Sequence, residues 1–206
     1  SGQDFDLRSR WGSYDYTKLE LALLGVHQTS NATVAVTALE AVRSRGLLWD
    51  EEALRAGFAS VRWPARVEVM GTTPLIVVDG AHTPASASAL VEALRRAAPD
   101  GWARATLILG VSSDKDIGGL LERLAPVADR LLLTRSRHPR AADPEALAAH
   151  PALQGREVRV VPEVAEAVRL ARASAAPDDL IVVAGSLFVA AEARYALLPA
   201  SERPLD

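Results

Sequence analysis

From residue 63 onward, short apolar runs rich in β-branched residues alternate with segments of helical pattern, and this alternation restricts the fold more than any other feature. Six runs are typical of strands: Val67–Met70, Leu75–Val78, Ala105–Val111, Arg130–Leu133, Glu157–Val161 and Leu180–Ala184. Helical patterns follow most of them, at Pro84–Ala97, Asp116–Leu124, Asp143–His150, Pro162–Ala173 and Leu187–Leu197. Strands joined through helices lie parallel, whereas a four-residue link between the first two runs permits only antiparallel pairing. We therefore expect an α/β fold with a six-stranded, mostly parallel sheet and helices on both faces.

Residues 1–62 have a different and less complete pattern. Turn residues come early, and alternating apolar positions in Lys18–Leu24 indicate short strands. Asn31–Arg45 predicts a helix that begins at Asn31 and ends at Gly46, and a second helix should run from Asp50 to Ser60. Two helices and a few short strands bury too little apolar surface for a complete domain. We therefore place a domain boundary between residues 62 and 63, with a whole α/β domain over residues 63–206.

Composition excludes several classes of function. The 206 residues contain no cysteine, which rules out disulfides, thiolate metal sites and cysteine nucleophiles. A net charge of −3, from 26 acidic and 23 basic residues, leaves no broad basic face for nucleic acid. No apolar run reaches the roughly 18 residues of a membrane-spanning helix. We expect neither a nucleic-acid nor a membrane partner, and we note that Lys18 and Lys115 are the only lysines among the cations.

Polar residues gather after four of the predicted strands, where open parallel sheets bind their ligands. These segments are Asp79–Pro84, Gly110–Asp116, Thr134–Arg140 and Gly185-Ser186. An acid, a histidine, a lysine between two aspartates, several arginines and a Gly-Ser turn at one sheet edge indicate a site for an anionic ligand. The sequence contains no G-x-x-x-x-G-K-[ST], G-x-G-x-x-G or H-E-x-x-H motif. It therefore holds neither a standard phosphate-binding loop nor a standard zinc site.

Each of these residues also has a structural interpretation. Asp79 suits a pair of ribose hydroxyls, but an aspartate at a strand end also caps turns. His82 can act in catalysis or bond to its own turn, and Lys115 can contact a ligand or form a solvated ion-pair cluster with its flanking aspartates. Gly185-Ser186 forms either a tight turn or an anion-binding helix N-terminus. The residue types alone leave these alternatives open.

Six motifs, in order along the chain, carry a resemblance to a known family. They are Gly25–Ala32 (GVHQTSNA), Trp63–Glu68 (WPARVE), Asp79–Pro84 (DGAHTP), Asp114–Asp116 (DKD), Pro139–Ala141 (PRA) and Gly185–Phe188 (GSLF). The series resembles the C-terminal part of folylpolyglutamate synthase/dihydrofolate synthase, a member of the Mur ligase superfamily, and it covers nearly the whole chain. The wording of the motifs looks like the folate branch rather than the muramyl-peptide ligases. The resemblance implies that residues 1–62 are the C-terminal fragment of an ATPase domain and that residues 63–206 are a Rossmann-like C-terminal ligase domain.

The resemblance also implies an activity. The family's enzymes use ATP to phosphorylate a substrate carboxylate, and the amino group of L-glutamate attacks the acyl phosphate. The expected substrates are ATP, L-glutamate and folate or dihydropteroate, with Mg²⁺ as cofactor, in a cytoplasmic monomer. The P-loop, the magnesium ligands and a carbamylated lysine would lie upstream of Ser1, so the chain by itself is expected to be inactive. The alternatives are another amide ligase of muramyl or cyanophycin type, a stand-alone nucleotide- or ligand-binding module, and a generic α/β nucleotide-binding domain.

By the same resemblance, six residues have expected roles. ATP is bound by Asn31 at the adenine edge, Arg66 at the phosphates, Asp79 at the ribose and His82 beside the nucleotide. Lys115 and Ser186 orient the incoming glutamate. His82 and Lys115 are the candidates for a catalytic role, and no residue of the chain is expected to bind a metal.

The chain departs from the family's pattern at two positions. Ala65 stands where the family usually has glycine, a mild change unless the backbone requires a positive φ angle. Thr83 stands where the family usually has asparagine. Threonine still caps the following helix, with Pro84 at the first helical position, but any contact made by the asparagine amide is lost.

Overall fold

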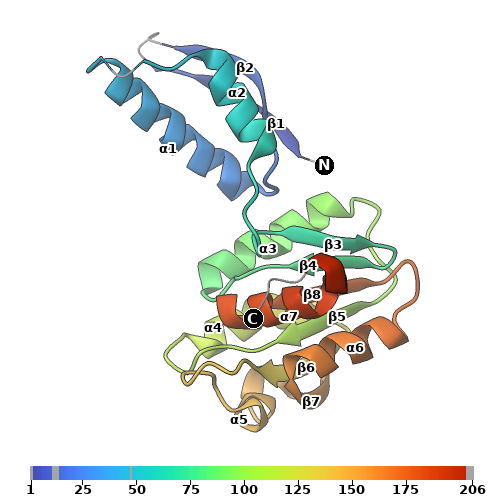
Figure 1. Cartoon of the computed structure of the whole chain (residues 1–206). Coiled ribbons are helices and arrows are strands. Elements are labelled where there is room, and N and C mark those ends of the chain that lie inside the picture. The colour runs from blue at the N-terminus through green and yellow to red at the C-terminus, as the bar shows by residue number, and fades with distance from the viewer. Residues whose placement is uncertain (1, 11–13, 47, 203–206) are drawn as a thin grey trace. The chain divides into compact units, whose positions relative to one another are not determined.

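The computed structural model describes residues 2–10, 14–46 and 48–202. The chain divides into two compact units, Ser1–Pro64 (unit 1) and Ala65–Asp206 (unit 2), and each is described by itself (Figure 1). Within the described ranges, no helix combines the length and apolar character that a bilayer crossing requires.

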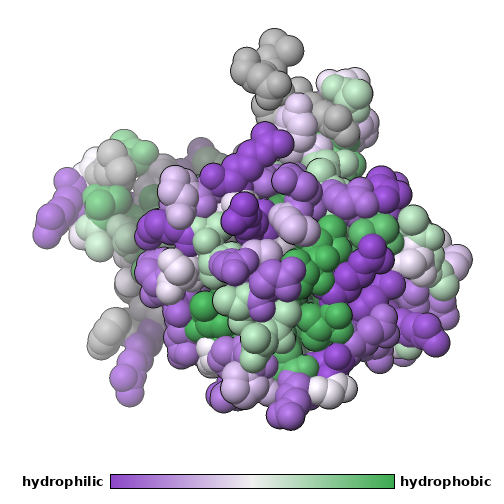
Figure 2. Space-filling model, turned by 90° about the horizontal axis from the view of Figure 1, so that it is seen from below, coloured by the Kyte–Doolittle hydropathy of each residue, from purple (hydrophilic) through white to green (hydrophobic). Residues whose placement is uncertain are grey.

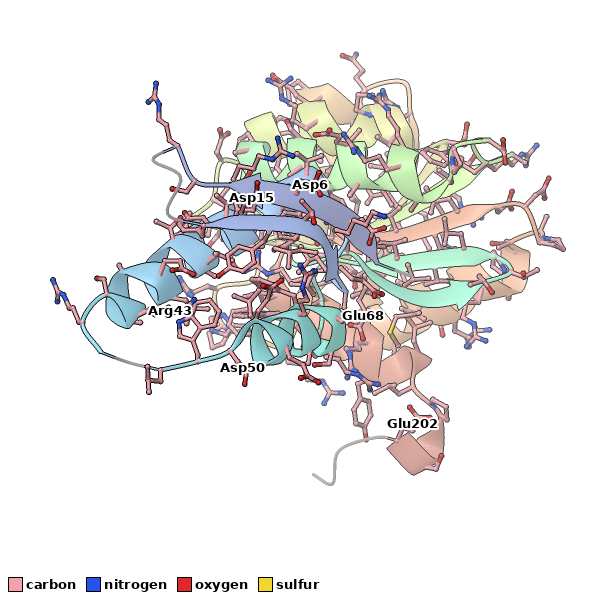
Figure 3. The ribbon with its side chains drawn as sticks, turned by 90° about the horizontal axis from the view of Figure 1, so that it is seen from above. Asp6, Asp15, Arg43, Asp50, Glu68 and Glu202 are labelled. Atoms are coloured by element: carbon pink, nitrogen blue, oxygen red, sulfur yellow. The ribbon has the colours of Figure 1, made fainter. Side chains whose placement is uncertain are left out.

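Unit 1 consists of a two-stranded antiparallel ribbon and two helices. Strand β1 (Gln3–Arg8) pairs with β2 (Asp15–Leu21), and these are followed by α1 (Val26–Arg43) and α2 (Glu51–Ser60). Figure 3 labels Asp6 and Asp15 on the ribbon, Arg43 on α1 and Asp50 at the start of α2. The buried residues that pack together inside the unit come from both strands and both helices: Leu7, Tyr16, Leu19, Val36 and Leu54. The short strands expected in this region are present, but β2 lies three residues earlier than the predicted Lys18–Leu24.

The first helix begins before the predicted residue. Asn31 is not its start, because α1 already begins at Val26, and Asn31 lies in its second turn. Gly25 precedes the helix with a φ angle of 103°, which a residue with a Cβ rarely adopts, and so redirects the chain into the helix. The first turn is polar (His27-Gln28-Thr29-Ser30) and has no apolar period, so the sequence pattern does not indicate a helix there.

Unit 2 is built on a six-stranded sheet with the order β3-β4-β8-β5-β6-β7. The strands are β3 (Glu68–Thr72), β4 (Leu75–Val78), β5 (Ala105–Leu109), β6 (Arg130–Arg135), β7 (Glu157–Glu163) and β8 (Leu180–Ala184). Strands β3 and β4 pair antiparallel and all other neighbours pair parallel, which confirms the predicted sheet. Val78 and Ile108 both lie level with Val183, so the three central strands β4, β8 and β5 end at one edge.

Helices cover both faces of this sheet, as predicted (Figure 1). They are α3 (Pro84–Ala97), α4 (Ile117–Leu124), α5 (Pro144–Ala148), α6 (Val164–Ser174) and α7 (Leu187–Leu197). Helices α6 and α7 pack small and branched side chains, including Ala167, Val168 and Ala190, against Ile108, Ile181 and their neighbours on one face. Helices α3 and α4 lie on the other face and pack against each other. On the side of unit 2 shown in Figure 2, hydrophilic residues surround separate apolar areas.

Two strand boundaries differ from the predicted ones because the backbone turns. The predicted first strand starts at Val67, but β3 starts at Glu68, since Val67 has a φ angle of 47° and cannot join a ladder. The predicted strand Ala105–Val111 ends at Leu109, and Gly110 then passes so close to the end of β6 that a Cβ would lie 2.5 Å from the carbonyl oxygen of Thr134. The other predicted strands and helices agree with the structure to within a few residues.

Candidate functional site

The loops that follow β4, β8, β5 and β6 meet at the carboxyl edge of the sheet of unit 2. The Gly185 N–H donates to the carbonyl of Ala81 over 2.8 Å, and the Ser113 N–H donates to the carbonyl of Arg140, also over 2.8 Å. These bonds tie the loop after β8 to the loop after β4, and the loop after β5 to the loop after β6. The structure therefore brings the predicted segments containing Asp79, Lys115 and Ser186 to one edge.

Asp79 holds the backbone where the chain enters unit 2. Its carboxylate is buried, and its two oxygens accept the N–H groups of Val67 and Ala81, each over 2.7 Å. Asp79 thus caps a turn, which is the structural one of the two interpretations that the sequence left open for this residue.

The segment that Asp79 holds is conformationally unusual. Ala65 and Val67 have positive φ angles, 57° and 47°, on either side of the exposed Arg66. Such conformations strain residues that carry a Cβ, by roughly 1–3 kcal/mol each. Ala65 therefore has the positive φ angle at which alanine in place of the family's glycine is more than a mild change. Three hydrogen bonds from the surrounding structure fix the segment: Asp79 with Val67, Gly80 with Ala65, and Glu68 with Ala65.

His82 also bonds to its own turn. Its Nδ1 lies 2.8 Å from the carbonyl oxygen of Gly80, and because a carbonyl can only accept, Nδ1 must carry the proton of this bond. In the neutral ring, Nε2 is then left with a lone pair that can accept a hydrogen bond. Thr83 and Ser86 form a capping box at the start of α3, with Pro84 in the first turn, which confirms the helix start predicted there.

Lys115 is one of two cations on a single carboxylate. Its Nζ lies 3.4 Å from Oδ2 of Asp114, and Nη1 of Arg140 lies 3.3 Å from the same oxygen. Desolvation raises the pKa of Asp114, but a backbone hydrogen bond and the charges of Lys115 and Arg140 outweigh it, so this pKa lies below its ordinary value. The cluster carries more positive than negative charge, which suits an anionic ligand although the ion pair itself is solvated.

Ser186 begins the last helix. Its side chain is buried, and Oγ accepts the N–H of Val189 over 3.0 Å, so Ser186 is the N-cap of α7. The hydroxyl keeps its own proton as a donor. The turn before it depends on Gly185, which has a φ angle of 109° and whose Cβ, if present, would lie 2.5 Å from the carbonyl oxygen of Gly110.

Asn31 belongs to unit 1 and is described apart from the other candidates. It lies exposed on α1, and its Nδ2 donates to Oε1 of the buried Gln28 over 3.0 Å. In the part of the chain that the structure describes, no three His, Cys, Asp or Glu side chains group as a metal site would require. We therefore derive no step through a metal ion from these residues.

Two arrangements at this edge escape sequence reasoning. The rings of His138 and Phe188 stack with centroids 3.8 Å apart and planes inclined by 17°, which joins the loop after β6 to the start of α7. Arg194 of α7 forms a half-buried ion pair with Glu68 of β3, over 2.9 Å. The only sequence signal near the His138 stack is that its partner, Phe188, belongs to the Gly-Ser-Leu-Phe motif.

Helices α3, α4 and α7 begin at this edge. Their N-caps are the side chains of Thr83, Asp116 and Ser186, respectively. Helix N-termini carry partial positive charge and exposed N–H groups, which favour anions. Fold and edge together define an α/β domain of the class that binds anionic ligands at the carboxyl ends of its strands.

Comparison with known proteins makes this class specific. Residues 65–187 match the family described as Mur ligase, glutamate ligase domain, and the chain belongs to this family. The chain is 36% identical to the dihydrofolate synthase/folylpolyglutamate synthase of Mycobacterium tuberculosis, over 94% of the chain and 42% of that protein. These findings confirm the resemblance that the six motifs indicated.

Solved structures agree with this assignment. The chain superposes on M. tuberculosis folylpolyglutamate synthase complexed with ADP with a TM-score of 0.83 and 34% identity, covering 96% of this chain and 45% of that one. Against E. coli FolC in complex with DHPP and ADP, the TM-score is 0.76 with 31% identity, covering 92% of this chain and 42% of that one. The chain thus spans less than half the length of these relatives.

Proposed function

We propose that this chain is the C-terminal part of an ATP-dependent ligase that adds L-glutamate to folate, to dihydropteroate, or to both. The match of residues 65–187 to the glutamate ligase domain carries the proposal. It is supported by the ADP named in the titles of both solved relatives and by the DHPP named in one of them. Mg²⁺ would act with ATP and would be held by residues outside this chain.

In this proposal, unit 2 binds one side of the nucleotide and the incoming amino acid. Asp79 hydrogen-bonds the ribose hydroxyls, and His82 accepts a hydrogen bond through Nε2. The exposed guanidinium of Arg66 contacts the phosphates. These contacts hold ATP while a phosphoryl group passes to the substrate carboxylate.

Lys115 and Ser186 would orient L-glutamate. The Lys115 ammonium attracts a glutamate carboxylate, and the Ser186 hydroxyl, whose acceptor side is used by Val189, donates to it. Both act next to helix N-termini, where a carboxylate is stabilised by about 0.3–1 kcal/mol per terminus. Oriented in this way, the amino group can attack the acyl phosphate and release phosphate.

The binding half of the proposal is testable on residues 1–206. In ¹⁵N spectra, ADP should shift the amide signals of Asp79–His82, and L-glutamate should shift those near Lys115 and Ser186. Lys115→Ala should abolish the glutamate shifts, whereas Lys18→Ala, the matched change of the other lysine on β2, should leave them intact. Glutamate shifts that survive Lys115→Ala would remove Lys115 from the site.

The ligase half needs a polypeptide that joins this chain to a P-loop ATPase region. There, ADP release should require both L-glutamate and a folate or dihydropteroate acceptor, and Arg66→Ala should raise the KM for ATP. Turnover with a muramyl-peptide acceptor instead would assign the chain to the other branch of the superfamily.

A further inference from the structure

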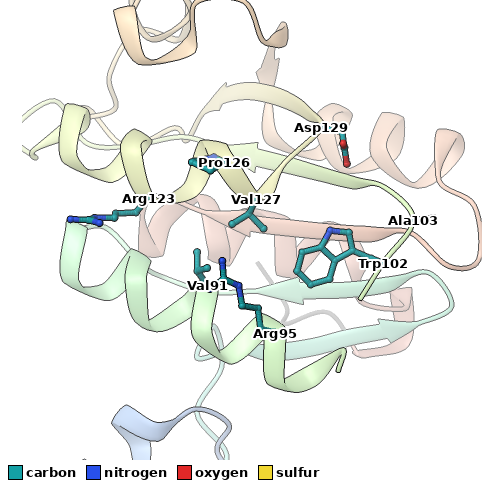
Figure 4. A pocket seen from close by; sticks show the side chains of 8 residues that line it. All are labelled: Val91, Arg95, Trp102, Ala103, Arg123, Pro126, Val127 and Asp129. Carbon is teal, nitrogen blue, oxygen red and sulfur yellow. The ribbon is translucent and has the colours of Figure 1, made fainter. Parts of the chain in front are cut away.

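A hollow lies at the edge of the unit 2 sheet opposite the candidate functional site, where β5 and β6 begin (Figure 4). Its volume is about 370 Å³, within the range of small-molecule sites. Eight residues line it: Val91 and Arg95 of α3, Trp102 and Ala103 before β5, Arg123 of α4, and Pro126, Val127 and Asp129 before β6. The site proposed for nucleotide and glutamate uses none of them.

Two arginines on this hollow, Arg95 and Arg123, have no partner in the described part of the chain. Among residues 2–10, 14–46 and 48–202, neither Arg95 nor Arg123 makes an ion pair or a side-chain hydrogen bond. The neighbouring Arg96 differs, because its Nη2 lies 3.0 Å from the Glu92 carboxylate on the same helix. The last turn of α3 thus carries one neutralised arginine and one unneutralised arginine, and the unneutralised one lines the hollow.

The helix ends do not account for both charges. Arg95 and Arg123 lie in the last turns of α3 and α4, where the macrodipole favours a cation. A helix C-terminus carries only about half a negative charge, and its effect fades within one turn. Two full positive charges therefore exceed the two half charges, and neither guanidinium donates to a helix carbonyl in the described structure.

The acid in the lining serves another purpose. Oδ2 of Asp129 accepts the Ala105 N–H over 2.7 Å, and the Asp129 N–H donates to the Ala105 carbonyl over 2.9 Å, so Asp129 fixes the start of β5. Figure 4 places Asp129 and Trp102 at one end of the hollow and Arg123 at the other, with Arg95 reaching toward Val91 between them. Asp129 therefore does not neutralise Arg123.

Trp102 supplies a flat surface and a donor. It is half-buried, and its indole N–H has no hydrogen-bond partner among the described residues. An aromatic ring stacks favourably on such a face, and Val91, Val127 and Pro126 add apolar contact. Guanidinium groups bind carboxylate or phosphate in fork geometry.

From these observations we propose that the hollow is a binding site for a small aromatic anion. The ring of the ligand packs on Trp102 and the two valines, and its carboxylate or phosphate binds Arg95, with Arg123 as a second cation. The hollow lies near the C-terminal ends of α3 and α4, whereas the N-terminal ends of these two helices lie at the candidate functional site. It is therefore separate from the proposed ligase function and does not depend on it.

The test is a titration of residues 1–206 followed by the indole N–H signal of Trp102, which Trp102→Phe identifies by its disappearance. Benzoate and phenyl phosphate are the probes and distinguish a carboxylate from a phosphate ligand, while benzamide is the neutral control. At least one anionic probe should shift the Trp102 signal in a saturable way, and benzamide should bind at least about tenfold more weakly, because it cannot form the charge-assisted bond.

Arg95→Gln should weaken binding of the anionic probe about tenfold. Because Arg95 is exposed, the substitution should leave the fold intact, which the amide spectrum checks directly. Arg96→Gln is the matched control, with the same charge change one residue away, and should leave binding unchanged. Equal weakening by both substitutions would show a general charge effect and overturn the proposal. Equal binding of benzamide, or no saturable shift of Trp102 with either anion, would also overturn it.

Discussion

Replacing Gly185 by alanine tests the packing on which the carboxyl edge of unit 2 depends. At a φ angle of 109°, alanine is strained by about 1–3 kcal/mol. Its Cβ would also lie 2.5 Å from the Gly110 carbonyl oxygen and 2.9 Å from Cδ1 of Leu109, and relieving such overpacking costs a further 1–3 kcal/mol or so. The sum, about 2–6 kcal/mol, is a large share of the roughly 5–15 kcal/mol that stabilise a domain.

Two other glycines of unit 2 separate strain from overpacking. Gly155 has a φ angle of 77° but open space around it, so Gly155→Ala should lose only the conformational part, about 1–2 kcal/mol. Gly118 lies in α4 without a positive φ angle, and an added Cβ would make ordinary contact, 3.6 Å from Nε2 of His150. Gly118→Ala should therefore stabilise unit 2 by up to about 1 kcal/mol.

The three variants are compared by urea unfolding followed by far-UV circular dichroism. Amide exchange of β8 reports the free energy of unfolding of unit 2 alone, so unfolding of unit 1 does not enter the comparison. We expect the order Gly118→Ala, Gly155→Ala, Gly185→Ala from most to least stable. If Gly185→Ala costs no more than Gly155→Ala, the close approach of the turn after β8 to Gly110 is refuted.

Three further predictions concern other parts of the chain. Burial and a hydrogen bond to Glu40 raise the pKa of Tyr16 from 10.0 to about 12, so Tyr16 stabilises the fold below pH 10 and loses that contribution as the pH rises toward about 12. Tyr16→Phe should therefore reduce the fall of the thermal unfolding temperature with pH in this range. An unchanged pH dependence would contradict the prediction. Glu68→Ala removes the half-buried partner of Arg194 and should lower the free energy of unfolding by about 1–3 kcal/mol in urea, whereas Arg96→Ala, at an exposed ion pair, should change it by less than about 1 kcal/mol. Residues 1–206 alone should release no phosphate from ATP above the buffer rate in a coupled assay. Sustained release would show that these residues hydrolyse ATP by themselves, against the proposal that they need a P-loop region to do so.

The sheet could be predicted because its signal is periodic and local. Leucine, isoleucine, valine and alanine fill the strand Leu180–Ala184 completely, since a central parallel strand is buried on both faces. Links between strands then determine direction: the short link after β3 permits only antiparallel pairing, and the helices after the other strands favour parallel pairing. The cap at Thr83 is likewise indicated by its residue type and by the proline that follows it.

The start of α1 and the bend at Val67 could not be predicted, because both depend on backbone angles that the residue types disfavour or hide. Nothing about valine indicates a φ angle of 47°; the tertiary hydrogen bond from the Val67 N–H to the Asp79 carboxylate holds it there. The stack of His138 on Phe188 joins residues fifty positions apart, and no spacing rule connects them. For Asp79, the sequence left two interpretations open, and only the geometry shows its two backbone bonds.

The position of β8 has a consequence for how the molecule forms during synthesis. This strand is the last of the sheet in sequence, yet it lies between β4, which begins 105 residues earlier, and β5, which begins 75 residues earlier. Until residue 184 has left the ribosome, β4 and β5 have no common partner, and the loops carrying Asp79 and Gly110 have nothing to hold them side by side. Such late, long-range pairing folds slowly and leaves apolar strand edges exposed to other chains. We therefore expect the nascent chain to depend on chaperones until β8 has been synthesised. A chain truncated at residue 175, which lacks β8, should aggregate rather than form part of the site.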